Sequence, residues 1–315
     1  MPVSCFLAPT RRRALPAADD NASGVEALLE LSRALVAVPP DGCVRLVACT
    51  LEAPIQNQAA QRRRPWPVAA VLRPVCRVLY DPAMIIDLPA IETALDADGW
   101  AISRGLLSPD ECTAMVALYA DDARFRKRVV MEQHGYGQGT YAYFSYPLPD
   151  AIAGLRSSLY AQLVPVANRW SGTLGSDIVY PPTHAELVAQ CHAAGQLRPT
   201  PLLLRYLQGD YNRLHQDVYG ELLFPLQVVV LLSRPGVGAG ADFTGGELVM
   251  TEQRARMQSR PMVLPLEQGD AAIIAVKQRP VQGRRGVHRV QLRHGVSALR
   301  SGERHTLGII FHDAT

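Results

Sequence analysis

The spacing of apolar residues changes near residue 200. Between residues 86 and 199 they recur at helical spacing, as in the stripe from Ile152 to Leu163 within a helix predicted from Pro149 to about Trp170. Two further helices are predicted to begin at capping boxes, Ser108–Glu111 and Thr183–Glu186. We therefore expect this part of the chain to supply helices that support a separate core.

From residue 200 onward, short apolar runs alternate with glycine-rich turns. Many short strands divided by turns are typical of a double-sheet jelly roll. The expected fold is mostly β with flanking helices: a jelly-roll (double-stranded β-helix) core at residues 200–315 and helical support at residues 86–199. The predicted strands are Leu202–Leu207, Arg213–Asp217, Gln227–Ser233, Gly245–Met250, Met262–Glu267, Gly269–Val276 and Glu303–Phe311.

Residues 1–85 differ from both parts, because they mix alanine, proline and arginine and show little periodicity. One amphipathic helix is predicted from about Gly24 to Val38. Arginine clusters at residues 11–13 and 62–64 fit either a solvated extension or a contact with nucleic acid. We expect a poorly structured N-terminal extension, followed by one domain at residues 86–315.

His215 and Asp217 lie two positions apart on a predicted strand. Side chains at this spacing point to the same side, so both can reach one metal ion while Gln216 faces away. A third ligand must come from elsewhere, and His294 supplies a second imidazole. Two imidazoles and one carboxylate occupy one face of an octahedral ion and leave the opposite positions open, as in non-heme Fe(II) oxygenases. The three residues therefore predict an iron site.

Arg304 follows His294 by ten residues. This spacing lets the chain leave one strand, turn at Ser301–Gly302 and return alongside on the next. The planar guanidinium of Arg304 suits bidentate binding of a carboxylate. Thr306 lies two residues further on and shares the same strand face. The pair predicts a carboxylate site close to the metal.

The tail from His294 to Ala314 carries His-Gly-Val, then Ser301-Gly-Glu-Arg304 and Thr306. It resembles the distal motif of 2-oxoglutarate- and Fe(II)-dependent dioxygenases, specifically the prolyl-4-hydroxylase-like branch. It is even more similar to a bacterial oxygenase family described as acting in oxidative demethylation of damaged DNA. The resemblance covers roughly residues 86–315, and it implies the same jelly-roll fold.

The resemblance also implies the cofactors and their ligands. Fe(II) would be held by His215, Asp217 and His294, with 2-oxoglutarate as cosubstrate, O2 as oxidant and ascorbate as a candidate reductant. Arg304 and Thr306 would hold the far carboxylate of 2-oxoglutarate. Tyr206, on the strand before the metal pair, would donate a hydrogen bond to the same molecule.

Three other histidines near the distal motif are assigned to other places. His288 competes with His294 for the metal, but the spacing to Arg304 favours His294, and His288 is expected near the pocket rather than in it. His305 is expected on the face opposite Arg304, and His312 further along the last strand.

Two segments leave alternatives open. Glycines interleaved with aromatic residues at Gln133–Tyr146 fit either a mobile substrate loop or a hairpin with a packed aromatic face. The basic cluster between Lys277 and Arg293 fits either a solvated loop or an anionic substrate, nucleic acid included.

Composition sets broader limits. The net charge of +3 neither requires nor excludes a polyanionic partner. No apolar run is long enough to span a membrane, and no basic segment precedes an apolar leader, so a cytoplasmic protein without membrane contact is expected. The six cysteines contain no Cys-x-x-Cys pair and are expected to be reduced thiols. The oligomeric state is not set by the sequence.

The expected function is a 2-oxoglutarate- and Fe(II)-dependent dioxygenase that hydroxylates a C–H bond. Its substrate stays open between a protein or peptide, a nucleic acid with an N-methylated base, and a small molecule. The alternatives are a dedicated nucleic-acid demethylase and a non-catalytic jelly-roll binding module.

Overall fold

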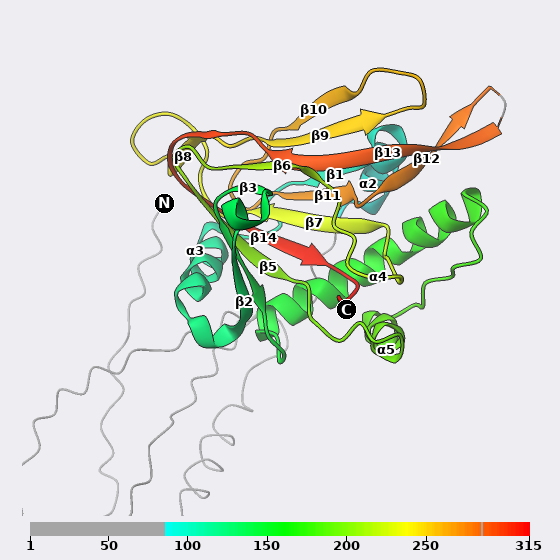
Figure 1. The fold of residues 1–315 in the computed structure, drawn as a ribbon, viewed down its shortest axis with the longest axis horizontal. Helices are drawn as coiled ribbons and strands as arrows, with labels where there is room; N and C mark the ends of the chain where they lie inside the picture. The colour runs from blue at the N-terminus through cyan, green and yellow to red at the C-terminus, as the bar shows by residue number, and fades with distance from the viewer. Residues whose placement is uncertain (1–85, 285) are drawn as a thin grey trace, which may run out of the picture. The chain divides into compact units, whose positions relative to one another are not determined.

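Two antiparallel sheets form the core of the computed structural model, which describes residues 86–284 and 286–315 (Figure 1). The larger sheet contains β1 (Trp100–Ser103), β2 (Phe125–Val130), β4 (Thr140–Phe144), β5 (Leu202–Leu207), β7 (Leu226–Leu231), β8 (Phe243–Gly245), β11 (Ala271–Ala275) and β14 (Leu299–Ile310). Their order is β1-β11-β7-β14-β5-β4-β2, and β8 pairs with part of β14.

The smaller sheet carries two of the predicted metal ligands. Its strands are β3 (Gly137–Gln138), β6 (Tyr211–His215), β9 (Leu248–Gln253), β10 (Arg260–Leu264), β12 (Gln278–Gly283) and β13 (Gly286–Val296). They follow the order β10-β9-β13-β6-β3, with β12 paired to β13. Strands of both sheets bury apolar side chains in one common core, as Leu307 of β14 and Leu292 of β13 illustrate. The predicted jelly-roll class is confirmed.

The helices lie around these sheets. They are α2 (Leu88–Asp98), α3 (Pro109–Ala117), α4 (Asp150–Thr173) and α5 (His184–Ala193), with short 3-10 turns η1 (Leu118–Ala120), η2 (Asp122–Arg124) and η3 (Met131–His134). Both capping boxes form, at Ser108 and at Thr183. The predicted stripe of α4 is buried, and α4 runs along the outer side of the larger sheet (Figure 1).

The part expected to give helical support also contributes strands. β1 extends one end of the larger sheet, β4 and β2 extend the other, and β3 joins the smaller sheet. Most of the basic run at Arg124–Arg128 therefore lies in an edge strand, because β2 ends the larger sheet, and its Lys127 and Arg128 are exposed. Within Gln133–Tyr146, β4 pairs with both β2 and β5, so this segment is a built part of the sheet.

Two local predictions are wrong. The strand expected to carry Asp217 ends at His215, so Asp217 lies in the following loop. The chain turns after Val296 rather than at Ser301–Gly302, and β13 and β14 belong to different sheets instead of lying side by side. Gly302 instead lies within β14 at a positive φ of 83°. A Cβ atom there would collide with the backbone of Asp242 and Phe243, where β8 begins.

The basic cluster between Lys277 and Arg293 is not a loop but the hairpin of β12 and β13. Arg279 is buried and pairs with Glu252 at 2.7 Å, and Arg289 donates to a backbone carbonyl. These two arginines therefore stabilise the fold. Arg285 lies outside the described residues.

The predicted extension at residues 1–85, with its helix and arginine clusters, also lies outside the described residues. Within the described part, Cys112 and Cys191 are buried free thiols. None of the described helices combines the length and apolar character that crossing a membrane requires.

Candidate metal centre and its pocket

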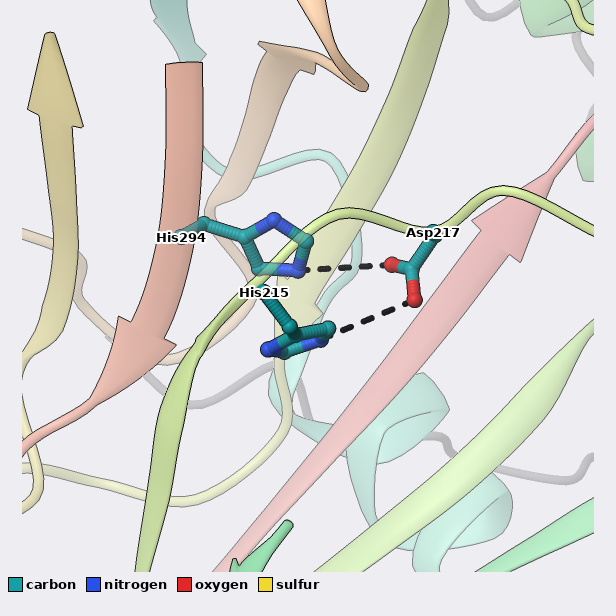
Figure 2. A group of neighbouring side chains, drawn as sticks. All are labelled: His215, Asp217 and His294. Atoms are coloured by element: carbon teal, nitrogen blue, oxygen red, sulfur yellow. Dashed lines mark ion pairs between the residues drawn. The ribbon is translucent and has the colours of Figure 1, made fainter. Parts of the chain in front are cut away.

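The three predicted metal ligands meet at one end of a cavity of about 640 Å³. His215 ends β6, and His294 lies directly opposite it on the paired strand β13. Asp217 reaches the same point from the loop after β6. One candidate ligand atom from each residue lies within 4.8 Å of the other two (Figure 2).

The three side chains already contact one another. Nε2 of His294 lies 3.3 Å from one carboxylate oxygen of Asp217, and Nε2 of His215 lies 3.6 Å from the other (Figure 2). The imidazole rings have centroids 4.3 Å apart. Two imidazoles and a carboxylate on one side of an open cavity fit Fe(II) with vacant positions for other ligands.

Contacts behind the ligands fix their orientation. Nδ1 of His215 lies 2.7 Å from the backbone carbonyl of Arg213, so Nδ1–H donates and the Nε2 lone pair faces the site. Tyr219 donates a hydrogen bond to Asp217 at 2.7 Å, and Tyr143 donates to the Tyr219 hydroxyl at 3.0 Å. Neither tyrosine was predicted from the sequence to support the site, although Tyr219 repeats the two-residue spacing after Asp217.

The electrostatics of these groups suit a cation. Burial alone would raise the pKa of Asp217, but the hydrogen bond and charge of His294, with help from His215 and Tyr219, outweigh it and lower this pKa. Burial, and then the charge of His294, lowers the pKa of His215. Near neutral pH the carboxylate is therefore ionised and His215 neutral, which are the forms that bind a metal.

Arg304 lies on β14 and faces the same cavity. It is 1% exposed, and its Nε and Nη1 atoms have no hydrogen-bond partner among the described residues. Its guanidinium lies 5.5 Å from the ring centre of Tyr206 and 5.8 Å from that of Phe243. Burial lowers the pKa of Arg304 to about 10, so it stays charged near neutral pH. A buried cation with unpaired donors fits a carboxylate ligand.

The two other predicted cosubstrate residues flank this arginine. Thr306 lines the cavity two residues further along β14, and Tyr206 is opposite Arg304 in the pairing of β5 and β14. Tyr206 is fully buried, and burial raises its pKa to about 12. Its hydroxyl accepts from Asn212 at 3.4 Å, which leaves the O–H free to donate. The three residues fit the far carboxylate of 2-oxoglutarate.

Of the three other histidines near the distal motif, His305 lies where it was expected, whereas His288, expected near the pocket, does not line the cavity, and His312, expected on the last strand, follows the end of that strand. His288 is exposed on β13, away from the cavity. His305 packs edge-on against Tyr119 with centroids 5.8 Å apart, on the face opposite Arg304. His312 follows the end of β14 and is fully buried, and its Nδ1 accepts from a backbone N–H at 3.3 Å.

Aromatic and basic side chains line the rest of the cavity. Tyr141 and Tyr143 reach it from β4, while Lys127 and Arg213 line it and are exposed. Tyr136 is half exposed, and its ring stacks on that of His134 with centroids 5.4 Å apart. The aromatic segment thus supplies both a packed strand and part of the cavity wall. One further lining residue, the buried Gln227, was missed; its signal was a polar residue inside an apolar strand.

Residues 139–314 match the model of a family described as "Oxygenase, catalysing oxidative methylation of damaged DNA". Uncharacterized proteins from two strains of Mycobacterium tuberculosis are each 47% identical to this chain over 171 residues, or 54% of this chain and 72% of each relative.

Among solved structures, a Pseudomonas putida prolyl-4-hydroxylase is similar at 16% identity and a TM-score of 0.42, covering 70% of this chain and 96% of that chain. An oxidoreductase of the 2OG-Fe(II) oxygenase family from Burkholderia pseudomallei has the same identity and TM-score, covering 72% and 92%.

Proposed function

Since the chain belongs to the oxygenase family matched by residues 139–314, we propose that it uses Fe(II), 2-oxoglutarate and O2 to hydroxylate an N-methyl group on a damaged base of DNA. The observation that carries this proposal is one cavity that holds two imidazoles and a carboxylate together with the buried Arg304, two of whose nitrogens have no hydrogen-bond partner among the described residues. The expected oxidoreductase class agrees with the family, so the binding-module alternative is dropped.

When bound, Fe(II) and 2-oxoglutarate would supply the chemistry that activates O2 to oxidise a C–H bond, with release of succinate and carbon dioxide. His215, Asp217 and His294 hold the metal in this proposal. Arg304 and Thr306 bind the far carboxylate of 2-oxoglutarate, and Tyr206 donates a hydrogen bond to it. The protein thereby fixes which substrate carbon lies within reach of the metal.

Hydroxylation of an N-methyl group removes the methyl. One oxygen atom enters the C–H bond to give N–CH2OH, which loses formaldehyde and leaves N–H. The family description names methylation, yet an oxygenase supplies oxygen and no methyl donor. We therefore propose that the damaged, methylated base is the substrate and that the unmethylated base is the product.

Residues at the cavity mouth support a nucleic-acid substrate. Lys127 and Arg213 are exposed cations that can approach phosphates, and the stacked pair of His134 and Tyr136 offers an aromatic face to a base. A base must leave a duplex to enter such a pocket, so single strands should react faster. We place this activity in the cytoplasm, where thiols stay reduced.

A succinate- and formaldehyde-coupled screen tests the proposal. Methylated single- and double-stranded oligonucleotides, proline-containing peptides and small metabolites are compared, with Asp217→Ala as the inactive control. The proposal expects succinate and formaldehyde in equal amounts with methylated single strands. Succinate with a peptide and no formaldehyde would replace it with peptide hydroxylation.

A further inference from the structure

Gln227 is a polar residue in an otherwise apolar strand. It lies on β7, whose other residues are leucine and valine, and it is 1% exposed. Its cross-strand neighbours are Ile310 on β14 and Ile274 on β11, neither of which can bond to an amide. The amide oxygen has no hydrogen-bond partner among the described residues.

The amide nitrogen of Gln227 contacts the metal site directly. It lies 3.3 Å from Nε2 of His294, the atom that also faces Asp217. Once that nitrogen donates its lone pair to a metal, it can no longer bond to the amide. Among the described residues, both polar ends of Gln227 then lack a partner, which is unfavourable for buried polar groups. A ligand in the cavity must satisfy them.

The position of the amide indicates which ligand this is. Gln227 lies within hydrogen-bonding distance of His294, a predicted metal ligand. On β14, Gln227 is paired with Ile310, whereas Arg304 comes six residues earlier on that strand and lines the same cavity. A 2-oxo acid carries one carboxylate beside its keto group, and that end binds the metal. The amide N–H is a donor suited to these oxygens.

We propose that Gln227 hydrogen-bonds the metal-bound end of the 2-oxo acid, as the near-end counterpart of Arg304. This inference rests on the proposed iron and 2-oxoglutarate site. It predicts that Gln227 contributes to the binding of any 2-oxo acid, whereas Arg304 contributes only when the acid has a second carboxylate.

Binding to protein loaded with redox-inert Mn(II) tests this prediction. Calorimetry gives the Kd of Mn(II), of 2-oxoglutarate and of 2-oxobutyrate, which lacks the second carboxylate. Gln227→Met keeps the length of the side chain and should raise the Kd of both acids by a similar factor, about tenfold or more. Arg304→Met should raise the Kd of 2-oxoglutarate and leave that of 2-oxobutyrate unchanged. The Mn(II) affinity of Gln227→Met should match that of the wild type.

A matched control is Gln268→Met, which removes an amide that donates to a backbone carbonyl at 2.9 Å outside the cavity; it should bind both acids normally. Unchanged affinities in Gln227→Met would overturn the inference, as would a loss confined to Mn(II), which would mean that the amide acts through His294. A change only in the KM for an oligonucleotide would also overturn it, since the amide would then contact the substrate. Failure of the wild type to bind either acid would overturn the proposed function as well.

Discussion

The two ends of the cavity solve the problem of buried charge differently. At the metal end, formed by His215, Asp217 and His294, the buried carboxylate already has protein partners: it lies 3.3 Å from Nε2 of His294 and accepts a hydrogen bond from Tyr219. The anchor end, where Arg304 lies, differs. Arg304 is buried, and its Nε and Nη1 have no hydrogen-bond partner among the described residues. Burial lowers its pKa, the charge of Glu247 offsets only part of that effect, and the Glu247 carboxylate accepts a hydrogen bond from Arg300 instead.

The metal and the cosubstrate should therefore contribute differently to the stability of the fold. The protein preorganises the metal end through contacts that exist without the ion. At the anchor end, the desolvated guanidinium is compensated only when an anion enters, so cosubstrate binding should stabilise the fold more than its contact area suggests.

The largest expected effect comes from removing a metal ligand. His294→Ala should abolish both metal binding and succinate formation, because two ligands cannot complete the site. His288→Ala, an exposed histidine on the same strand, is the matched control and should stay active. Metal titration together with the succinate assay checks both variants. Loss of activity in His288→Ala, with activity kept in His294→Ala, would contradict the assignment.

Arg304→Met should affect the binding of 2-oxoglutarate without affecting the binding of the metal. We expect the Kd for 2-oxoglutarate to rise about 100-fold, since two charge-assisted hydrogen bonds are lost, while the metal Kd stays unchanged. The ligand-free variant should be as stable as the wild type or more stable, because an uncompensated buried charge is gone. Calorimetric titration and thermal unfolding without ligand measure these effects. Marked destabilisation of the ligand-free variant would show that Arg304 holds the fold.

A smaller change should follow from the contact behind Asp217. Tyr219→Phe removes the hydroxyl that orients the carboxylate, and metal affinity should fall about 10-fold or more. Tyr180→Phe loses a hydrogen bond of similar length, 2.8 Å to a backbone carbonyl away from the site, and serves as the control. Equal metal affinity in both variants would exclude a role for Tyr219 in positioning Asp217.

A separate prediction concerns acid stability and two buried histidines that are not predicted metal ligands. Burial lowers the pKa of His184 and that of His312 to about 4, below the usual 6.5. Between pH 6.5 and 4 the unfolded chain therefore binds more protons, and the free energy of unfolding falls as the pH falls, by up to about 1.4 kcal/mol per pH unit and histidine. His184→Gln should flatten this slope in denaturant titrations; an unchanged slope would rule out its contribution.

The sequence predicted the site better than its surroundings. His215, Asp217, His294 and Arg304 line one cavity, as the sequence predicts from two local spacings, His-x-Asp and a histidine ten residues before an arginine. Their roles as ligands stay predictions. The loop position of Asp217 was missed, since β6 ends where its pairing with β13 ends, and pairing is a tertiary property.

Gln227 and Tyr143 were missed for the same reason. Each becomes part of the site only because β7 or β4 lies beside a distant strand in the folded sheets. A glutamine within an apolar run and a tyrosine within an aromatic one do not show by themselves which cavity they face.

Anaerobic titration of the wild type with Fe(II) and 2-oxoglutarate tests the central claim most directly. The account predicts a weak visible charge-transfer band that needs both components, saturates at one 2-oxoglutarate per chain, is absent in Asp217→Ala and needs far more 2-oxoglutarate in Arg304→Met. No band in the wild type, or an equal band in Asp217→Ala, would contradict it.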